Sequence, residues 1–174
     1  QVLVCSTGVI GRPLPMEKIR SGIESLIPKI ADDDESFQAA THGIMTTDTR
    51  PKTSSRTIKT PEGQIRIVGF AKGAAMIGPN MATMLAFILT DAVAPADELA
   101  NHIKRAVDRS FHSISVEGHT STNDSVILLA NGASGASAQG AGKAFASALD
   151  EVAMDLAMAI VDDAEEATHR LTID

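Results

Sequence analysis

The segment from Lys72 to Asp91 contains a threonine, Thr83, that could become a nucleophile. It reads KGAAMIGPNMATMLAFILTD, so Gly, Pro and Asn residues lead into an apolar run that follows Thr83. A threonine hydroxyl is a weak nucleophile by itself. It can be activated if the threonine is the first residue of a chain, because its free amine then acts as the base. Cleavage of the peptide bond between Ala82 and Thr83 would create this pair.

The new amine would suit the role of a general base. An α-amino group titrates at about pH 7.7–8.0, close to the pH at which such a base works best. The residue types of Gly78-Pro79-Asn80 favour a tight turn ahead of the cleavage site. A second interpretation stays open, because threonine is a common first residue of a strand and the apolar run would form a buried strand without any chemistry.

Two further groups of residues have types that suit acyl transfer. Attack on an acyl group needs donors for the oxygen that becomes negative, and one donor contributes about 3–4 kcal/mol in well-studied enzymes. Thr7 and Gly8 follow an apolar segment and could supply a hydroxyl and an N–H, although they also suit an ordinary turn at a strand end. Lys72 could hold the carboxylate of an amino-acid substrate, or it could be a surface lysine.

A glycine-rich stretch, NGASGASAQGAGK from Asn131 to Lys143, offers a competing hypothesis of phosphate or nucleotide binding. A Walker-type loop needs glycine where Ser137 stands and serine or threonine where Ala144 stands. A dinucleotide fingerprint that starts at Gly140 would need glycine at Phe145. The stretch is therefore expected to be a flexible connector that precedes a helix.

Composition excludes several classes of protein. The chain has 174 residues, 44% hydrophobic and 21% charged, which is typical of one globular domain. A net charge of −7 and the absence of Trp and Tyr argue against a nucleic-acid partner. The single cysteine, Cys5, predicts no disulfide and a reducing cytoplasm, and neither it nor the five histidines suggest a metal site. No apolar stretch is long enough to predict a membrane span or a signal peptide.

Hydrophobic periodicity predicts alternating strands and helices, and hence a mixed α/β unit that spans residues 1–174. The acidic run at residues 32–35 is expected to cap a helix rather than to bind calcium. Pro61-Glu62-Gly63 is expected to join two strands of a hairpin. The strands are predicted at 2–5, 56–60, 65–70, 83–90, 125–130 and 170–173, and the helices at 16–30, from 95 to about 107, and 141–163.

Five blocks of the sequence, in this order, resemble the bifunctional ornithine acetyltransferase and N-acetylglutamate synthase family of arginine biosynthesis. They are STGVIG (6–11), MTTDT (45–49), KGAAMIGPNMATML (72–85), TSTND (120–124) and LLANG (128–132). The resemblance covers nearly the whole chain and corresponds to the middle of a family member. Residues before Gln1 and after Asp174 are therefore expected, and the family's downstream Asn and C-terminal Thr of the substrate site have no counterpart here.

The resemblance implies a four-layer α/β/β/α sandwich, as in ornithine acetyltransferases and self-cleaving aminopeptidases. Self-cleavage would divide the chain into 1–82, the end of an α chain, and 83–174, the start of a β chain. The halves would associate as a heterotetramer. The implied reaction moves the acetyl group of N-acetylornithine to glutamate through an acetyl-threonine intermediate, without a cofactor, although some members also accept acetyl-coenzyme A. A hydrolase of the same fold, which gives the acyl group to water, is the alternative.

The resemblance also assigns site residues. Thr83 is the implied nucleophile, and Thr7 and Gly8 form the implied oxyanion hole. The implied substrate-binding residues are Thr46, Lys72, Thr83 and Glu165, with Thr47 and Glu166 as alternatives at neighbouring positions. The glutamate is placed by a family segment that reads like DGEGATK, where this chain has DAEEATH from 163 to 169, so both glycines are replaced. Ala75 and Glu117-Gly118-His119 also depart from the family pattern.

Overall fold

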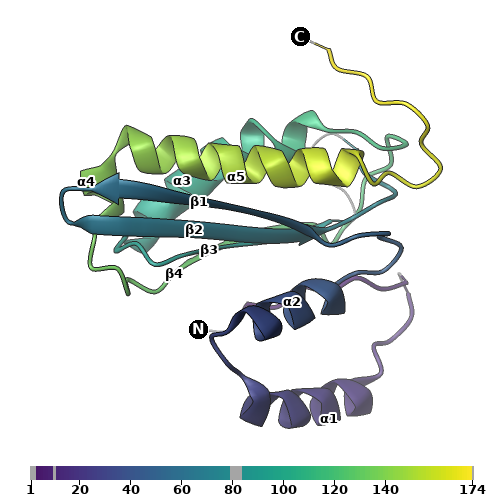
Figure 1. The fold of residues 1–174 in the computed structure, drawn as a ribbon. Helices are drawn as coiled ribbons and strands as arrows, with labels where there is room; N and C mark the ends of the chain where they lie inside the picture. Colours follow the sequence, from purple (N-terminus) through teal and green to yellow (C-terminus); the bar gives the residue numbers. More distant parts are fainter. Residues whose placement is uncertain (1–2, 10, 79–83, 174) are drawn as a thin grey trace.

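The computed structural model describes residues 3–9, 11–78 and 84–173, which form a mixed α/β fold around one sheet (Figure 1). Its strand order is β1-β2-β3-β4. The strands are β1 (Lys52–Thr60), β2 (Gly63–Lys72), β3 (Leu85–Thr90) and β4 (Ser125–Ala130). The α-helices are α1 (Met16–Leu26), α2 (Asp34–Gly43), α3 (Ala96–Asp108), α4 (Ala138–Ala141) and α5 (Lys143–Val161), with 3₁₀ turns at Ile27–Lys29 and Phe111–Ser113.

The predicted hairpin is confirmed, and it is the first unit of the sheet. β1 and β2 pair antiparallel from Thr60 opposite Gly63 to Lys52 opposite Ala71. Gly63 has φ 142°, a backbone conformation that suits glycine, directly after the turn. β3 then pairs antiparallel with β2 and parallel with β4, and helix α3 lies on the crossover between β3 and β4.

One face of the sheet packs against α5, which runs along β1 and β2 in Figure 1, with α3 behind it. The apolar residues of α5 recur at helical spacing, and their side chains are buried against this face. Gly69 of β2 allows the close approach, since a Cβ atom there would lie only 2.8 Å from Leu156 Cδ1 and 3.0 Å from Val152 Cγ1. The helix therefore fits against the strand at a position without a side chain.

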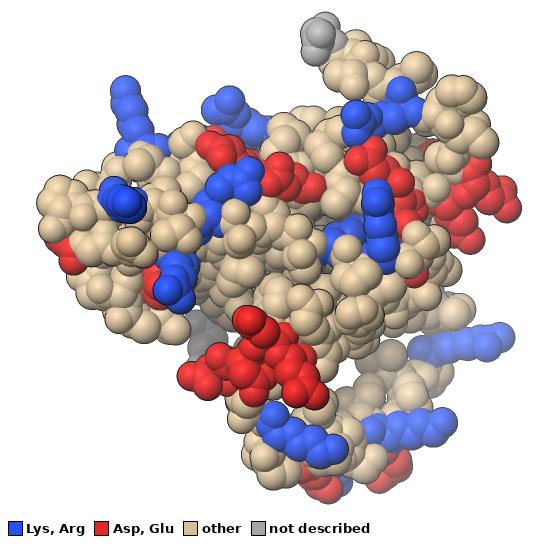
Figure 2. Space-filling model, viewed as in Figure 1, with Lys and Arg blue, Asp and Glu red and all other residues tan. Residues whose placement is uncertain are grey.

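The other face of the sheet is apolar but only partly covered. Phe70 of β2 stacks on Phe87 of β3, with ring centroids 5.1 Å apart, and Phe37 of α2 meets Phe70 edge-on at 5.5 Å. Asp33 caps α2 by accepting a hydrogen bond from the N–H of Ser36, which confirms the predicted cap. Figure 2 shows the acidic side chains gathered over the start of this helix.

The predicted helices are confirmed with shifted ends. Helix α1 stops at Leu26 and continues as a 3₁₀ turn, because Pro28 cannot donate a backbone hydrogen bond. The helix expected from 141 to 163 is α5 at 143–161. Gly142, with φ 52°, lies between α4 and α5 and turns the chain between them.

Two strand predictions are wrong for the described residues. The segment 3–5 of the first predicted strand and the segment 170–173 of the last form no strand. A strand needs a hydrogen-bonded neighbour, and neither segment has one among the residues that the structure describes. Their apolar side chains stay in solvent, with Val4 88% and Ile173 94% exposed. The strand predicted at 83–90 is confirmed from Leu85 onward, and Thr83 lies outside the described residues.

Candidate functional site

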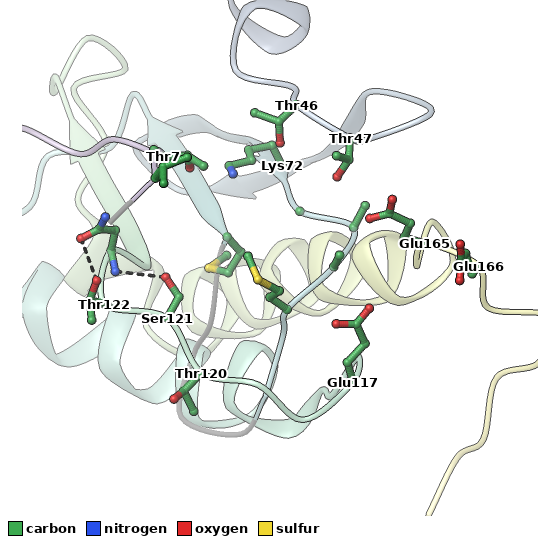
Figure 3. Close-up of a pocket in the computed structure, with 18 residues that line it drawn as sticks. Thr7, Thr46, Thr47, Lys72, Glu117, Thr120, Ser121, Thr122, Glu165 and Glu166 are labelled. Carbon is green, nitrogen blue, oxygen red and sulfur yellow. Dashed lines mark hydrogen bonds between the residues drawn. The ribbon is translucent and has the colours of Figure 1, made fainter. Parts of the chain in front are cut away.

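A cavity of about 950 Å³ lies at the end of β2 where the chain leaves the sheet (Figure 3). Its walls come from segments that are far apart in the sequence: residues 7–9, 46–47, 72–76, Met84, Glu117, 120–123 and 165–166. All of the predicted site residues within the described part of the chain line this one cavity. They are Thr7, Gly8, Thr46, Lys72 and Glu165, with the alternatives Thr47 and Glu166.

Lys72 is the last residue of β2, and its side chain is buried, with 1% of the residue exposed. The alternative of a surface lysine is therefore wrong. In Figure 3 its amine points toward Thr7. Burial lowers the pKa of Lys72 below its ordinary value, while the nearby carboxylates of Asp48 and Asp124 favour the charged form. A buried amine in a cavity wall is suited to binding an anionic group of a small molecule.

Thr7 and Gly8 enter the cavity from the segment before α1, which is exposed. Gly8 lies close to Leu14, since a Cβ atom added at Gly8 would be 3.6 Å from Leu14 Cδ2.

Thr46 and Thr47 follow α2 on another wall. The N–H of Thr46 donates a 3.1 Å hydrogen bond to Asp48, so the backbone of Thr46 is fixed. Both threonines line the cavity.

Glu165 and Glu166 follow α5 and differ in how the backbone holds them. The N–H of Glu165 donates a 2.7 Å hydrogen bond to the carbonyl of Ala74, which ties it to the segment after Lys72. Glu166 has φ 58°, a left-handed conformation that favours glycine. Figure 3 shows Glu165 on the side of Thr47, with Glu166 farther along the chain.

The proposed cleavage site, Ala82 and Thr83, lies outside the described residues. Its neighbour Met84 is described, is buried, and lines the cavity. The N–H of Met84 donates a 2.7 Å hydrogen bond to Asp124 Oδ1. Asp124 Oδ2 is buried and has no hydrogen-bond partner within the described part of the chain, and burial raises the pKa of Asp124 above its ordinary value. Met84, the residue that follows Thr83 in the sequence, is therefore held in the cavity wall.

Sequence reasoning missed two features of the site. Residues 120–123 form a polar wall, in which Thr122 bonds to Asn123 and the N–H of Asn123 bonds to Ser121, both at 3.3 Å. The clue was a run of small polar residues directly before a strand. The second feature is a buried ion-pair cluster of Asp48, Lys52 and Asp163 behind the cavity. Its clue was a lysine on the inward-facing side of β1.

The glycine-rich stretch lies away from this cavity and is unsuited to an anion. The carboxylate of Glu62 accepts a 2.6 Å hydrogen bond from the N–H of Ser137, at the start of the four-residue helix α4. A phosphate at this position would meet a negative charge. Among residues 3–9, 11–78 and 84–173, no group of three or more His, Cys, Asp or Glu side chains could hold a metal ion. In the same residues no helix combines the length and the apolar character that crossing a membrane requires.

Comparison with known proteins gives a match to one family along the chain. The description "ArgJ family" matches residues 1–174. The arginine biosynthesis bifunctional protein ArgJ of Geobacter sulfurreducens is 50% identical over 173 residues, which cover 97% of this chain and 43% of that protein. The protein of the same name from Methylococcus capsulatus is 46% identical over 177 residues, covering 99% and 43%. The mitochondrial ArgJ of Schizosaccharomyces pombe is 43% identical over 175 residues, covering 98% and 39%.

The chain thus spans about two fifths of the length of these relatives. Among solved structures, the crystal structure of the PH0078 protein from Pyrococcus horikoshii OT3 is similar over 66% of this chain and 40% of that chain, with a TM-score of 0.46 and 12% sequence identity. A likeness of this size supports no argument about the fold.

Proposed function

Because the chain belongs to the ArgJ family, we propose that it is part of an enzyme of arginine biosynthesis that moves the acetyl group of N-acetylornithine to glutamate. One observation supports this proposal most strongly. The described residues to which the family resemblance assigns roles come from four distant segments of the chain, and all of them line one cavity. The cavity is large enough for an acetylated amino acid.

We propose that the peptide bond between Ala82 and Thr83 is cut by the protein itself, which frees the amine of Thr83. The Thr83 hydroxyl then attacks the acetyl carbonyl while this amine takes the hydroxyl proton. The carbon–nitrogen bond of the acetyl amide breaks, and the proton passes to the departing nitrogen of ornithine. In the second half, the amine of glutamate attacks the acetyl ester, the carbon–oxygen bond breaks, and Thr83 regains its proton.

The cavity walls support specific roles in this reaction. Lys72 would bind the carboxylate of the substrate, because its amine is buried in the wall beside Gly73. Glu165 would bind the side-chain ammonium group of N-acetylornithine. Thr7 and Gly8 would donate hydrogen bonds to the oxygen that becomes negative on the acetyl group. Thr46 would contact the substrate from the wall that the segment after α2 forms. No cofactor takes part, and acetyl-coenzyme A is a further possible donor.

We also propose the four-layer α/β/β/α arrangement, in which a second sheet covers the open face of the first. Where no helix covers this face, its apolar side chains remain partly exposed, including Phe87, Leu89 and Leu129. An apolar sheet face is normally buried against another layer. The halves 1–82 and 83–174 would stay associated through the β2–β3 pairing and assemble as a heterotetramer. A cytoplasmic location stays a prediction, because the relative from Schizosaccharomyces pombe is named as mitochondrial.

The experiment compares the complete protein with its Thr83→Ala and Thr83→Ser variants. Intact mass and N-terminal sequencing should find a new amino terminus at Thr83 in the wild type and none in Thr83→Ala. Acetyl transfer by Thr83→Ala should fall at least about a thousandfold, the scale of loss for a removed nucleophile. Thr83→Ser keeps a hydroxyl and an amine and should retain cleavage. Transfer at the wild-type rate by an uncut protein would refute the proposal. Release of free acetate at the same rate with and without glutamate would identify a hydrolase.

A further inference from the structure

Behind the cavity, one lysine joins two aspartates in the protein interior. Lys52 Nζ lies 2.6 Å from Asp48 Oδ1 and 2.5 Å from Asp163 Oδ2. The side chains of Lys52 and Asp48 are 0% exposed, and that of Asp163 is 4% exposed. Lys52 begins β1, Asp48 precedes it by four residues, and Asp163 follows α5, so the cluster joins distant parts of the chain.

The aspartates also bind the backbone next to three residues of the cavity wall. Asp48 Oδ2 accepts a 3.1 Å hydrogen bond from the N–H of Thr46, and Asp48 Oδ1 accepts a 2.7 Å bond from the N–H of Gly73, the neighbour of Lys72. Asp163 accepts bonds from the N–H and the hydroxyl of Thr49 and lies two residues before Glu165. The three segments 46–49, 72–74 and 163–165 are thus tied to one ammonium group.

We propose that Asp48, Lys52 and Asp163 are positioning residues that hold Thr46, Lys72 and Glu165 at the distances that the substrate requires. This proposal rests on the proposed function for its kinetic consequences, whereas its structural consequences are independent of that function. None of the three residues lines the cavity, so they act through the backbone of the residues that do.

The composition of the cluster supports positioning over stability alone. Removing an ammonium or a carboxylate from water costs several kcal/mol per ion, and a well-packed apolar cluster of similar volume is often equally stable or more so. Apolar contacts, however, have no preferred orientation, whereas hydrogen bonds do. A carboxylate that accepts from two backbone N–H groups and an ammonium fixes the relative places of all three donors. The cluster therefore specifies the geometry of segments that no regular secondary structure joins.

The sharpest test is Asp48→Asn in the complete protein. The amide oxygen of asparagine can still accept from Lys52 and Gly73. Its NH₂ group, however, would face the N–H of Thr46, and two donors cannot bond. The link to Thr46 is lost while the size of the side chain is kept. Loss of one hydrogen bond corresponds to a rise in KM for N-acetylornithine of about tenfold, with kcat within about twofold of the wild type.

Asp163→Asn is the control that matches Asp48→Asn in its change of charge. It also removes one buried negative charge, but its oxygen can accept from Lys52 and from the N–H of Thr49, and the hydroxyl of Thr49 can reverse its role and accept from the new NH₂ group. Its KM should therefore stay within about threefold of the wild type. Asp155→Asn is the control outside the cluster, because Asp155 bonds to Arg56 and Ser54 on the exposed side of α5. It should change neither KM nor kcat.

Amide hydrogen exchange supplies a readout that needs no activity. Asp48→Asn should speed exchange at Thr46, whose N–H loses its acceptor, and should leave Gly73 unchanged, whereas Asp155→Asn should leave both unchanged. Equal KM changes in Asp48→Asn and Asp163→Asn, or unchanged exchange at Thr46, would overturn the positioning role. If the wild type transfers no acetyl group, the proposed function fails, but the exchange result still decides whether the cluster holds the wall segments.

Discussion

Asp48 accepts a 2.7 Å hydrogen bond from the backbone N–H of Gly73, and this contact fixes the point at which the chain leaves β2. Gly73 has φ 149°, a backbone conformation that suits glycine, immediately after Lys72. The carboxylate of Asp48 also favours the charged form of Lys72, whose pKa burial lowers. One aspartate thus contributes both to the place and to the charge of the lysine in the cavity wall.

The first prediction concerns this lysine. Lys72→Met keeps the length and the apolar stem of the side chain but removes the amine that, in the proposed function, makes a charge-assisted hydrogen bond to the substrate carboxylate. KM for N-acetylornithine should rise between about tenfold and a hundredfold, which corresponds to about 1.5–3 kcal/mol. Because the pKa of Lys72 is lowered, KM of the wild type should begin to rise with pH below the ordinary lysine pKa of about 10.4. Steady-state kinetics from pH 7 to 10 measure both effects.

Lys59→Met is the control for Lys72→Met. Lys59 lies on the same hairpin, is exposed, and belongs to no wall of the cavity. Its variant should keep the wild-type KM at every pH. If Lys59→Met raised KM as much as Lys72→Met does, the effect would come from the overall charge of the protein, and the binding role of Lys72 would be wrong.

The second prediction separates the two neighbouring glutamates. Glu165→Gln should raise KM for N-acetylornithine about tenfold, because it removes the charge that, in the proposed function, pairs with the substrate ammonium. Glu166→Gly should leave KM unchanged and increase the free energy of unfolding by about 0.5–1 kcal/mol, since glycine relieves the left-handed strain but adds freedom to the unfolded chain. Kinetics and urea unfolding test the pair. A KM increase in Glu166→Gly alone would assign the substrate to Glu166.

The third prediction concerns the stability of the fold at low pH. Burial alone would raise the pKa of Asp48 and of Asp163, but hydrogen bonds from Gly73, Lys52 and Thr49 outweigh it and lower both values below the ordinary 3.8. As the pH falls below about 4, the unfolded chain therefore takes up protons at these positions before the folded chain does. Their contribution to stability is complete above that pH and is lost as the pH falls through the lowered values.

Urea unfolding of the wild type and of the double variant Asp48→Asn/Asp163→Asn measures this contribution. The unfolding curves are recorded between pH 2.5 and 7, in steps of about half a pH unit. The free energy of unfolding of the wild type should fall more steeply below pH 4 than that of the double variant. Parallel curves would show that the two carboxylates do not have lowered pKa values.

The fourth prediction concerns the contact between β2 and α5. Gly69→Ala should lower the free energy of unfolding by about 1–3 kcal/mol, because the new methyl group would overlap Leu156 and Val152. Gly22→Ala is the matched control. Gly22 lies in α1 with no atom within 4 Å of an added Cβ, so its variant should stabilise the helix by about 0.5–1 kcal/mol. Equal effects of the two variants would mean that α5 does not pack closely on β2.

Local patterns predicted the elements that a few neighbouring residues specify. The hairpin at 61–63 has its own turn residues, and α3 and α5 have apolar residues at helical spacing. Local patterns failed at 3–5 and 170–173, because an apolar run becomes a strand only where a neighbour supplies hydrogen bonds. The split at Gly142 was also missed, because a glycine inside an apolar helical pattern can either be tolerated or turn the chain.

The sequence by itself determined the family, the types of chemical group in the site, and Thr83 as the residue to test, because motifs record residue types at fixed spacing. Only the tertiary structure decided that Thr46, Lys72 and Glu165 line one cavity and that Lys72 is buried. It also showed that Lys52 pairs with Asp163, which lies 111 positions away in the sequence, as well as with Asp48. Such contacts depend on how the sheet and α5 pack together, and a buried charge is stabilised only by partners that this packing supplies.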